Sequence, residues 1–153
     1  MDILGGFYTE ELLDGNTRQG FFVKTFEGKS GILARKGMKS AFKLNKYGID
    51  MDVIEGLCVP ALLDALKNKA VIVIDEIGSI ETLSSVFRKT VFECLNSSKS
   101  VFATIRFNSQ PFTDEVKEIQ DTDMVYLDRS NFSETKRRVK EWFSYAAEKK
   151  NNP

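Results

Sequence analysis

The feature that most constrains this chain is the apolar run Val71-Ile72-Val73-Ile74, which ends directly in the carboxylates Asp75 and Glu76. A short, uninterrupted run rich in β-branched residues is typical of a parallel strand that is buried on both faces. Segments with apolar residues at helical spacing lie on both sides of it. Strands that alternate with helices imply crossover connections. The pattern therefore predicts a layered α/β fold with a mostly parallel sheet.

The same reasoning predicts the other elements of a single domain over residues 1–153. We expect strands at residues 3–9, 20–26, 30–34, 70–74, 100–105 and 124–127, and helices from Asp52, over 83–95, over 113–119 and from about Ser133. The turn Glu27-Gly28-Lys29 joins two of these strands and predicts a β-hairpin. Asp52 is expected to cap the first helix, and Pro60 is expected to kink or divide it.

Composition excludes several classes of protein. The 22 basic and 22 acidic residues cancel, so no global field would attract nucleic acid or an anionic membrane. The chain has no histidine, and Cys58 and Cys94 form no CxxC pair, which excludes a Cys/His zinc site. No run approaches the roughly 20 apolar residues of a membrane-spanning helix. The N-terminus also lacks the features of a secretion signal, so we expect a cytoplasmic protein with reduced cysteines.

Asp75 and Glu76 lie where chemistry is expected, because ligands bind at the carboxyl ends of strands in open parallel sheets. Consecutive strand residues point to opposite faces, so the two carboxylates would have different tasks. In a nucleotide hydrolase the first would hold Mg²⁺ through its waters, and the second would orient or deprotonate the attacking water. Alternatively, acidic residues at a strand end simply cap the next helix. The pair alone leaves both interpretations open.

Further motifs stand in a characteristic order. They are Gly5-Gly6-Phe7-Tyr8-Thr9-Glu10-Glu11, Gly20-Phe21, Lys46-Tyr47-Gly48-Ile49-Asp50, Pro60-Ala61-Leu62, Ile72-Val73-Ile74-Asp75-Glu76-Ile77-Gly78 and Ala103-Thr104-Ile105. Over about residues 4–128 the chain closely resembles the cancer-related nucleoside triphosphatase family. The resemblance implies a three-layer, RecA-like P-loop fold with a hairpin insertion and slow, Mg²⁺-dependent hydrolysis of ATP, GTP and other nucleoside triphosphates. It also implies that Asp75 binds magnesium and that Glu76 activates water.

The chain departs from this family at its beginning. Family members start with a strand, a G-x-x-G-x-G-K-T phosphate loop and a helix, and none of these precedes Gly5 here. The segment Gly28-Lys29-Ser30 contains the end of such a motif, but Val23 stands where its first glycine belongs and no helix is predicted after Ser30. The missing loop would surround the phosphates with backbone N–H groups. We therefore expect weak or absent hydrolysis by this chain.

Two explanations fit the absence of the phosphate loop. Either the start of the chain is misassigned downstream of the loop, or the chain is a degenerate homologue that acts as a binding or scaffold module. In the family the lost strand lies beside the strand at 100–105. Its absence would leave unpaired backbone and exposed apolar surface unless a homodimer or a complementing segment fills the place.

Two further residues are candidate nucleotide contacts. Arg106 follows the strand at 100–105, where the family often has histidine, and could sense the γ-phosphate. The alternative is a solvated charge at a strand end. Asn131 stands where the family's base-contacting segment lies, although it could equally cap the last helix. That helix is basic, but helical spacing places Trp142 and Phe143 in the core, so nucleic acid is not an expected partner.

Overall fold

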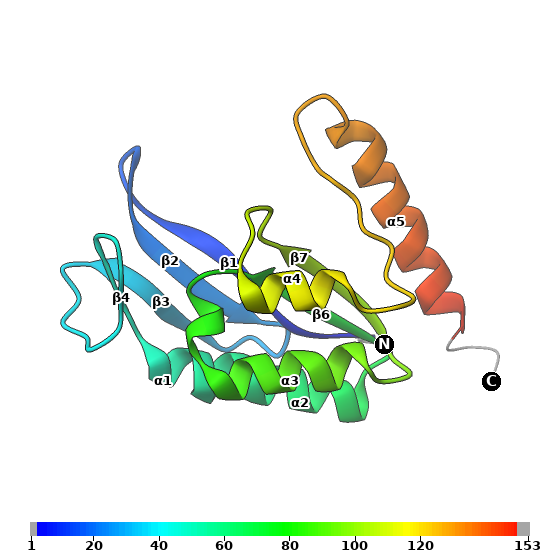
Figure 1. Cartoon of the computed structure of the whole chain (residues 1–153), viewed down its shortest axis with the longest axis horizontal. Helices are drawn as coiled ribbons and strands as arrows, with labels where there is room; N and C mark the ends of the chain where they lie inside the picture. Colours follow the sequence, from blue (N-terminus) through cyan, green and yellow to red (C-terminus); the bar gives the residue numbers. More distant parts are fainter. Residues whose placement is uncertain (1–2, 150–153) are drawn as a thin grey trace.

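The α/β prediction is confirmed by a computed structural model, which describes residues 3–149 (Figure 1). The strands are β1 (Leu4–Asp14), β2 (Thr17–Thr25), β3 (Ser30–Lys36), β4 (Lys43–Leu44), β5 (Tyr47–Ile49), β6 (Val71–Ile77) and β7 (Ser100–Ile105). The helices are α1 (Met51–Val53), α2 (Val59–Asn68), α3 (Ser85–Leu95), α4 (Pro111–Lys117) and α5 (Phe132–Lys149), with a π-helical turn η1 (Ile54–Cys58) and a 3₁₀ turn η2 (Glu81–Leu83).

The described strands form one mixed sheet in the order β4-β5-β3-β2-β1-β6-β7. Only the pairs β1–β6 and β6–β7 are parallel, and the other pairs are antiparallel. The expectation of a mostly parallel sheet is therefore wrong. The reason is that β1 runs past its pairing with β6 and forms a hairpin with β2, which then pairs with β3 as predicted. Turns this short can join only antiparallel strands.

The predicted burial of the central strand on both faces is confirmed. Ile72 and Ile74 of β6 belong to the main core with residues of α2 and α3. Val71 and Val73 belong to a second cluster, which includes Ala146 of α5. Since side chains alternate along a strand, β6 separates two apolar layers. The sheet around β6 and β7 thus has α2 and α3 on one face and α5 on the other, as the three-layer prediction required (Figure 1).

The first helical segment starts earlier than predicted. Asp50, not Asp52, is the N-cap, because Asp50 has an extended backbone and its Oδ1 accepts hydrogen bonds from the backbone N–H groups of Asp52 (3.0 Å) and Val53 (3.3 Å). At Pro60 the helical hydrogen-bond pattern changes, but the helix is not divided into two. Residues 51–68 run as one continuous helix, and the π-helical turn η1 ends just before Pro60, which has no N–H to give to the helical hydrogen-bond ladder.

The helix predicted over 83–95 is divided. Its first residues form η2, and Ser84 then caps α3 by accepting a hydrogen bond from the N–H of Phe87 at 3.1 Å.

The strand predicted at residues 124–127 is wrong, since residues 122–128 form no regular secondary structure. Its four side chains are 38–59% exposed. A strand needs a neighbour for its backbone N–H and C=O groups. In the described part of the chain, β7 is the last strand of the sheet, and no strand lies beyond it to pair with this segment. High β-propensity alone therefore does not produce a strand here.

Replacing Gly6 with alanine should strongly destabilise the fold. Gly6 pairs with Val73 across the β1–β6 ladder and has φ = +102°, and a Cβ there would lie 2.1 Å from the Val73 carbonyl oxygen. We expect Gly6→Ala to lower the unfolding free energy by about 3 kcal/mol in urea denaturation. Gly28→Ala is the control, because Gly28 has φ = +87° but open space around it, so only about 1 kcal/mol should be lost. Equal losses would contradict the packing argument.

Candidate functional site

The carboxyl end of β6 carries the predicted pair in a β-bulge. Ile74 pairs with Ala103 and Ile77 pairs with Ile105, so Asp75 and Glu76 together lie opposite a single residue of β7, Thr104. Bulges occur next to active sites because they redirect side chains. Asp75 Oδ1 accepts a hydrogen bond from Thr104 Oγ1 at 2.5 Å. Asp75 therefore has a hydroxyl partner on the neighbouring strand.

Arg106 lies at the same end of the sheet. Its backbone N–H donates to the Ile77 carbonyl oxygen at 3.2 Å, and its guanidinium Nη1 donates to Ser79 Oγ. The Arg106 side chain is half-buried, and its Nε is buried with no hydrogen-bond partner. Arg106 is therefore not the fully solvated strand-end charge that the alternative interpretation expected. The structure brings Arg106 together with Asp75 and Glu76.

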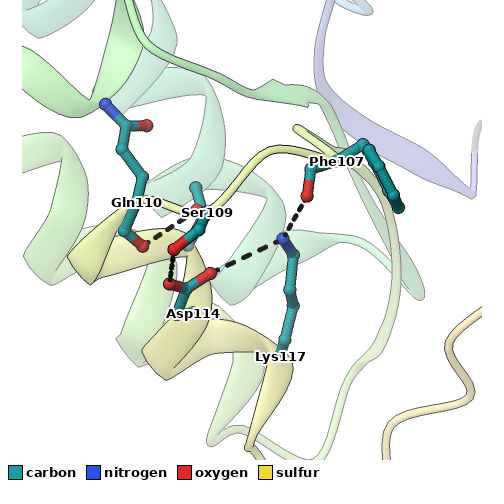
Figure 2. Close-up of polar contacts among 6 residues, drawn as sticks. Phe107, Ser109, Gln110, Asp114 and Lys117 are labelled. Atoms are coloured by element: carbon teal, nitrogen blue, oxygen red, sulfur yellow. Dashed lines mark hydrogen bonds and ion pairs between the residues drawn. The ribbon is translucent and has the colours of Figure 1, made fainter.

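The segment after Arg106 is held by the polar network that Figure 2 shows. Lys117 Nζ of α4 donates to the Phe107 carbonyl oxygen at 3.1 Å and forms an ion pair with Asp114 at 3.7 Å. Ser109 Oγ donates to Asp114 Oδ2 at 2.6 Å, and this bond is the main cause that lowers the Asp114 pKa. These contacts tie both ends of the loop to α4. The position of Arg106 is therefore fixed from the β7 side and from the α4 side.

Glu76 borders a small cleft of about 180 Å³ on the other side of the bulge. The cleft is lined by Thr9, Glu10, Glu11, Phe21, Leu33, Glu76, Ile80 and Glu81. The Glu76 side chain reaches solvent, yet loss of hydration raises its pKa, as does the nearby Asp75 carboxylate. Arg106 acts in the opposite direction and lowers the Glu76 pKa. Glu76 thus holds its proton more readily than an ordinary glutamate.

Glu81 is a site residue that the sequence did not reveal. Its side chain is 2% exposed, and its Oε2 has no hydrogen-bond partner. Burial, together with the charges of Glu76 and Asp75, raises the Glu81 pKa to about 8, although hydrogen bonds from the backbone N–H groups of Glu81 and Gly78 act in the opposite direction. The sequence pattern predicts only that Glu81 precedes a helix, where a glutamate is usually exposed. Nothing local marks it as buried.

Asn131 does not lie with Asp75 and Glu76 at the carboxyl end of β6. Its backbone carbonyl accepts the first hydrogen bond of α5, from the Thr135 N–H at 2.9 Å. Its side chain donates to the Tyr126 carbonyl oxygen at 2.8 Å and accepts from the Asp128 N–H at 3.0 Å. Asn131 thus occupies the capping position of α5, as the alternative expected. Among the described residues, no contact joins it to the carboxylates of β6.

The donor set at the end of β6 suits magnesium better than a metal held by protein alone. Within residues 3–149 no cluster of three or more histidine, cysteine, aspartate or glutamate side chains could hold a metal ion. Asp75 and the hydroxyl of Thr104 offer oxygen ligands at one point. Mg²⁺ keeps several waters and usually takes one or two carboxylates together with substrate phosphates. The residues present fit that mode of binding.

None of the described helices combines the length and apolarity needed to cross a bilayer.

Stability should fall as the pH rises through the titration of Glu81. Its folded pKa of about 8 lies above the ordinary value of 4.5, so the folded state binds the proton more tightly. The stabilisation is complete below the ordinary value and is lost as the pH rises towards 8. We expect a slope of up to about 1.4 kcal/mol per pH unit in this window. Glu81→Gln should remove most of it, and a smaller slope in the same direction should remain from Glu76.

Urea denaturation at pH 5.5, 6.5, 7.5 and 8.5 measures this slope. The control is Glu141→Gln, an exposed residue of α5 that pairs with Arg137 and should keep the wild-type slope. An unchanged slope in Glu81→Gln would show that Glu81 ionises normally in the folded protein.

Comparison with known proteins agrees with this geometry. Residues 2–140 match the model of a family described as NTPase. The nucleoside-triphosphatase THEP1 of Thermotoga maritima is 39% identical over 127 residues, which cover 83% of this chain and 73% of that protein. The crystal structure of THEP1 from Aquifex aeolicus has a TM-score of 0.77 at 31% identity and covers 87% of this chain and 79% of that one. The solution structure of a human cancer-related nucleoside triphosphatase has a TM-score of 0.74 at 26% identity, with coverages of 92% and 81%. The chain therefore belongs to the NTPase family and shares the fold of these nucleoside triphosphatases.

Proposed function

We propose that residues 1–153 form one NTPase-like domain that supplies the magnesium-and-water half of a nucleoside triphosphate hydrolysis site. The observation that carries this proposal is the bulge at the end of β6, which gives Asp75 and Glu76 different surroundings. One carboxylate has a hydroxyl partner on β7, and the other borders a cleft that also contains apolar side chains. Phosphoryl transfer requires both a metal-binding carboxylate and a group that positions water.

Each residue has a proposed role. Asp75, oriented by Thr104, would hold hydrated Mg²⁺, and that ion would neutralise charge on the polyphosphate. Glu76 would accept a hydrogen bond, and then the proton, from the attacking water. A raised pKa makes Glu76 a better base near neutral pH. Arg106 would contact the γ-phosphate through its guanidinium, whose Nε has no hydrogen-bond partner in this structure.

Asn131 is left out of this site, because its amide is already bonded to Tyr126 and Asp128.

The proposal also concerns how active this polypeptide is. The sequence contains no G-x-x-G-x-G-K-T loop, and the segment Gly28-Lys29-Ser30 lies in the turn between β2 and β3, with no helix after it. One well-placed donor to a transition state contributes about 3 to 4 kcal/mol. Without the whole set of phosphate-binding N–H groups, hydrolysis should be weak. The free, buried thiols of Cys58 and Cys94 support a reducing compartment such as the cytoplasm.

The chain alone should release little phosphate from ATP or GTP with Mg²⁺ in a malachite-green assay. Joining a strand, phosphate loop and helix from a family member to its N-terminus should restore turnover. In that fusion, Glu76→Gln should lower kcat about 10²- to 10⁴-fold because the base is lost. Asp75→Asn should raise the Mg²⁺ concentration needed for activity. Glu141→Gln, on the far helix α5, is the matched control and should change neither quantity.

Two results would contradict the proposal. Turnover by the chain alone that Glu76→Gln abolishes would show that no added loop is needed. Full turnover of the fusion in Glu76→Gln would show that Glu76 is not the base.

A second candidate is a binding or scaffold module that acts through the open edge of the sheet. In the described part of the chain β7 has a neighbour only on its β6 side. The exposed apolar segment at residues 124–127 lies near this edge, since the Tyr126 ring meets the Phe107 ring at 5.0 Å. Phe107 itself is 72% exposed. Such an edge could pair with a second copy of the chain or with a complementing segment.

Self-association through this edge should be visible in size-exclusion chromatography with light scattering. We expect a concentration-dependent dimer that Tyr126→Lys weakens at least tenfold, because a charge opposes apolar burial. Leu13→Lys is the control, since Leu13 is 53% exposed but lies at the far end of β1. A strict monomer at high concentration would count against this second function.

The observations do not favour nucleic acid as a partner. On α5, Arg137 pairs with Glu141 at 2.7 Å and Arg138 pairs with Asp123 at 3.1 Å. Trp142 and Phe143 pack against Phe102 of β7, as their helical spacing predicted. The aromatic side chains that could stack on bases are thus used in the core.

A further inference from the structure

The buried carboxyl of Glu81 needs a physical explanation. It lies in the 3₁₀ turn η2, which follows β6, and its Oε2 is enclosed without a hydrogen-bond partner. Backbone N–H groups of Gly78 and Glu81 hydrogen-bond the carboxyl but leave Oε2 unpaired, and a buried charge that is incompletely paired is costly. In native proteins such a group usually serves a function or carries a proton.

Glu76 and Glu81 converge on the same small space above Gly78. A Cβ atom on Gly78 would lie 2.5 Å from Glu76 Oε1 and 2.9 Å from Glu81 Oε2. Both oxygens therefore lie close to the space that the Cβ atom of any other residue at position 78 would occupy. Thr82 fixes this turn, since its N–H and its Oγ1 both donate to the Gly78 carbonyl oxygen, at 3.2 and 2.6 Å. The turn thus holds the two carboxyl groups close together.

The groups that face Glu81 are acidic or neutral. The charges of Asp75 and Glu76 of β6 raise its pKa, and Glu81 in turn raises the pKa of the Cys58 thiol in η1. Glu10 and Glu11 of β1 line the same cleft, and the backbone N–H groups of Gly78 and Glu81 hydrogen-bond the Glu81 carboxyl. Glu10 and Glu11 have their own cations, Lys24 at 2.7 Å and Arg18 at 2.8 Å. Among the described ion pairs none includes Glu81. Arg106 offsets part of the charge of Glu76, but it forms no described ion pair with Glu81, so repulsion between the two carboxyl groups favours a proton on one of them.

We propose that Glu81 is a positioning residue whose protonated carboxyl donates a hydrogen bond, directly or through one water, to the Glu76 carboxylate. This inference rests on the proposed role of Glu76 as the base that positions water. The donated bond fixes the Glu76 side chain at the mouth of the cleft. Glu81 does not itself touch the substrate.

Carbon NMR of the glutamate carboxyl groups tests the inference on the chain as it is, without nucleotide. The signal of Glu81 is identified by its loss in Glu81→Gln. In the wild type it should have the shift of a carboxylic acid at pH 7. Glu76→Gln should lower its titration midpoint by about one pH unit or more, because the neighbouring charge and acceptor are lost.

Two matched variants separate a hydrogen bond from a general effect of charge. Asp75→Asn also removes one negative charge from the end of β6, but it should move the Glu81 midpoint clearly less than Glu76→Gln does. Gly78→Ala should shift the midpoint, because its Cβ would lie 2.5 Å from Glu76 Oε1 and 2.9 Å from Glu81 Oε2 and would force the two groups apart. Gly56→Ala, where an added Cβ meets open space, should leave it unchanged.

Three outcomes would overturn the inference. These are a Glu81 signal that is ionised at pH 7, a midpoint that Glu76→Gln does not move, and equal shifts in Glu76→Gln and Asp75→Asn. Circular dichroism verifies that each variant is folded. Since the titration needs no nucleotide, failure of the hydrolysis assay would count against the proposed function and leave this test intact.

Turnover of the phosphate-loop fusion provides a second readout. Glu81→Met should lower kcat about tenfold with little change in KM, because the donor that orients the base is lost. Glu81→Gln should retain most of the activity, since an amide N–H can still donate. Equal activity in the methionine and glutamine variants would indicate that Glu81 only fills space.

Discussion

The position of β6 between β1 and β7 is the constraint on which the rest of the structure depends. Both neighbours are parallel to β6, so the three strands run in the same direction. The carboxyl ends of β6 and β7 lie at the same edge of the sheet, and β1 continues beyond this edge into its hairpin with β2. The strand is buried against helices on both faces, which leaves it no freedom to shift its register. Between the buried residues Ile74 and Ile77 the ladder with β7 is interrupted by a bulge, and the bulge contains the two acidic residues. Packing therefore determines where the charges appear.

The acidic residues near this bulge differ in burial, and burial separates their chemistry. Asp75 has a hydroxyl partner on β7, Glu76 reaches solvent at a cleft, and Glu81 is enclosed. Desolvation penalises the charged form, so the proton is held more tightly as burial increases from Glu76 to Glu81. Carboxyl groups in different environments can take different roles within one site. In the proposed site the most buried one supports its neighbour and does not react.

In the described residues the outer edge of β7 has no strand beside it, and the segment at 124–127 lies near this edge. Residues 124–127 have the composition of a strand, yet they are exposed and irregular because no strand pairs with them in the described structure. The nearby rings of Phe107 and Tyr126 contact each other and remain largely in solvent. The same part of the molecule thus carries unused backbone hydrogen-bonding groups and unused apolar surface. Either a complementing segment or a second copy of the chain would satisfy both.

What the sequence determined by itself was local or repeated along the chain. It identified the buried strand with Asp75 and Glu76 at its end, the β2–β3 hairpin and the family, because periodicity, turn residues and motif order are written in neighbouring positions. The tertiary structure alone decided the balance of parallel and antiparallel pairs, the loss of the strand at 124–127, and the bulge opposite Thr104. It also decided that Glu81 is buried beside Glu76 and that Asn131 lies outside the site. Each of these depends on what packs against a residue from elsewhere in the chain, and neither pairing partners nor burial can be read from the residue and its sequence neighbours.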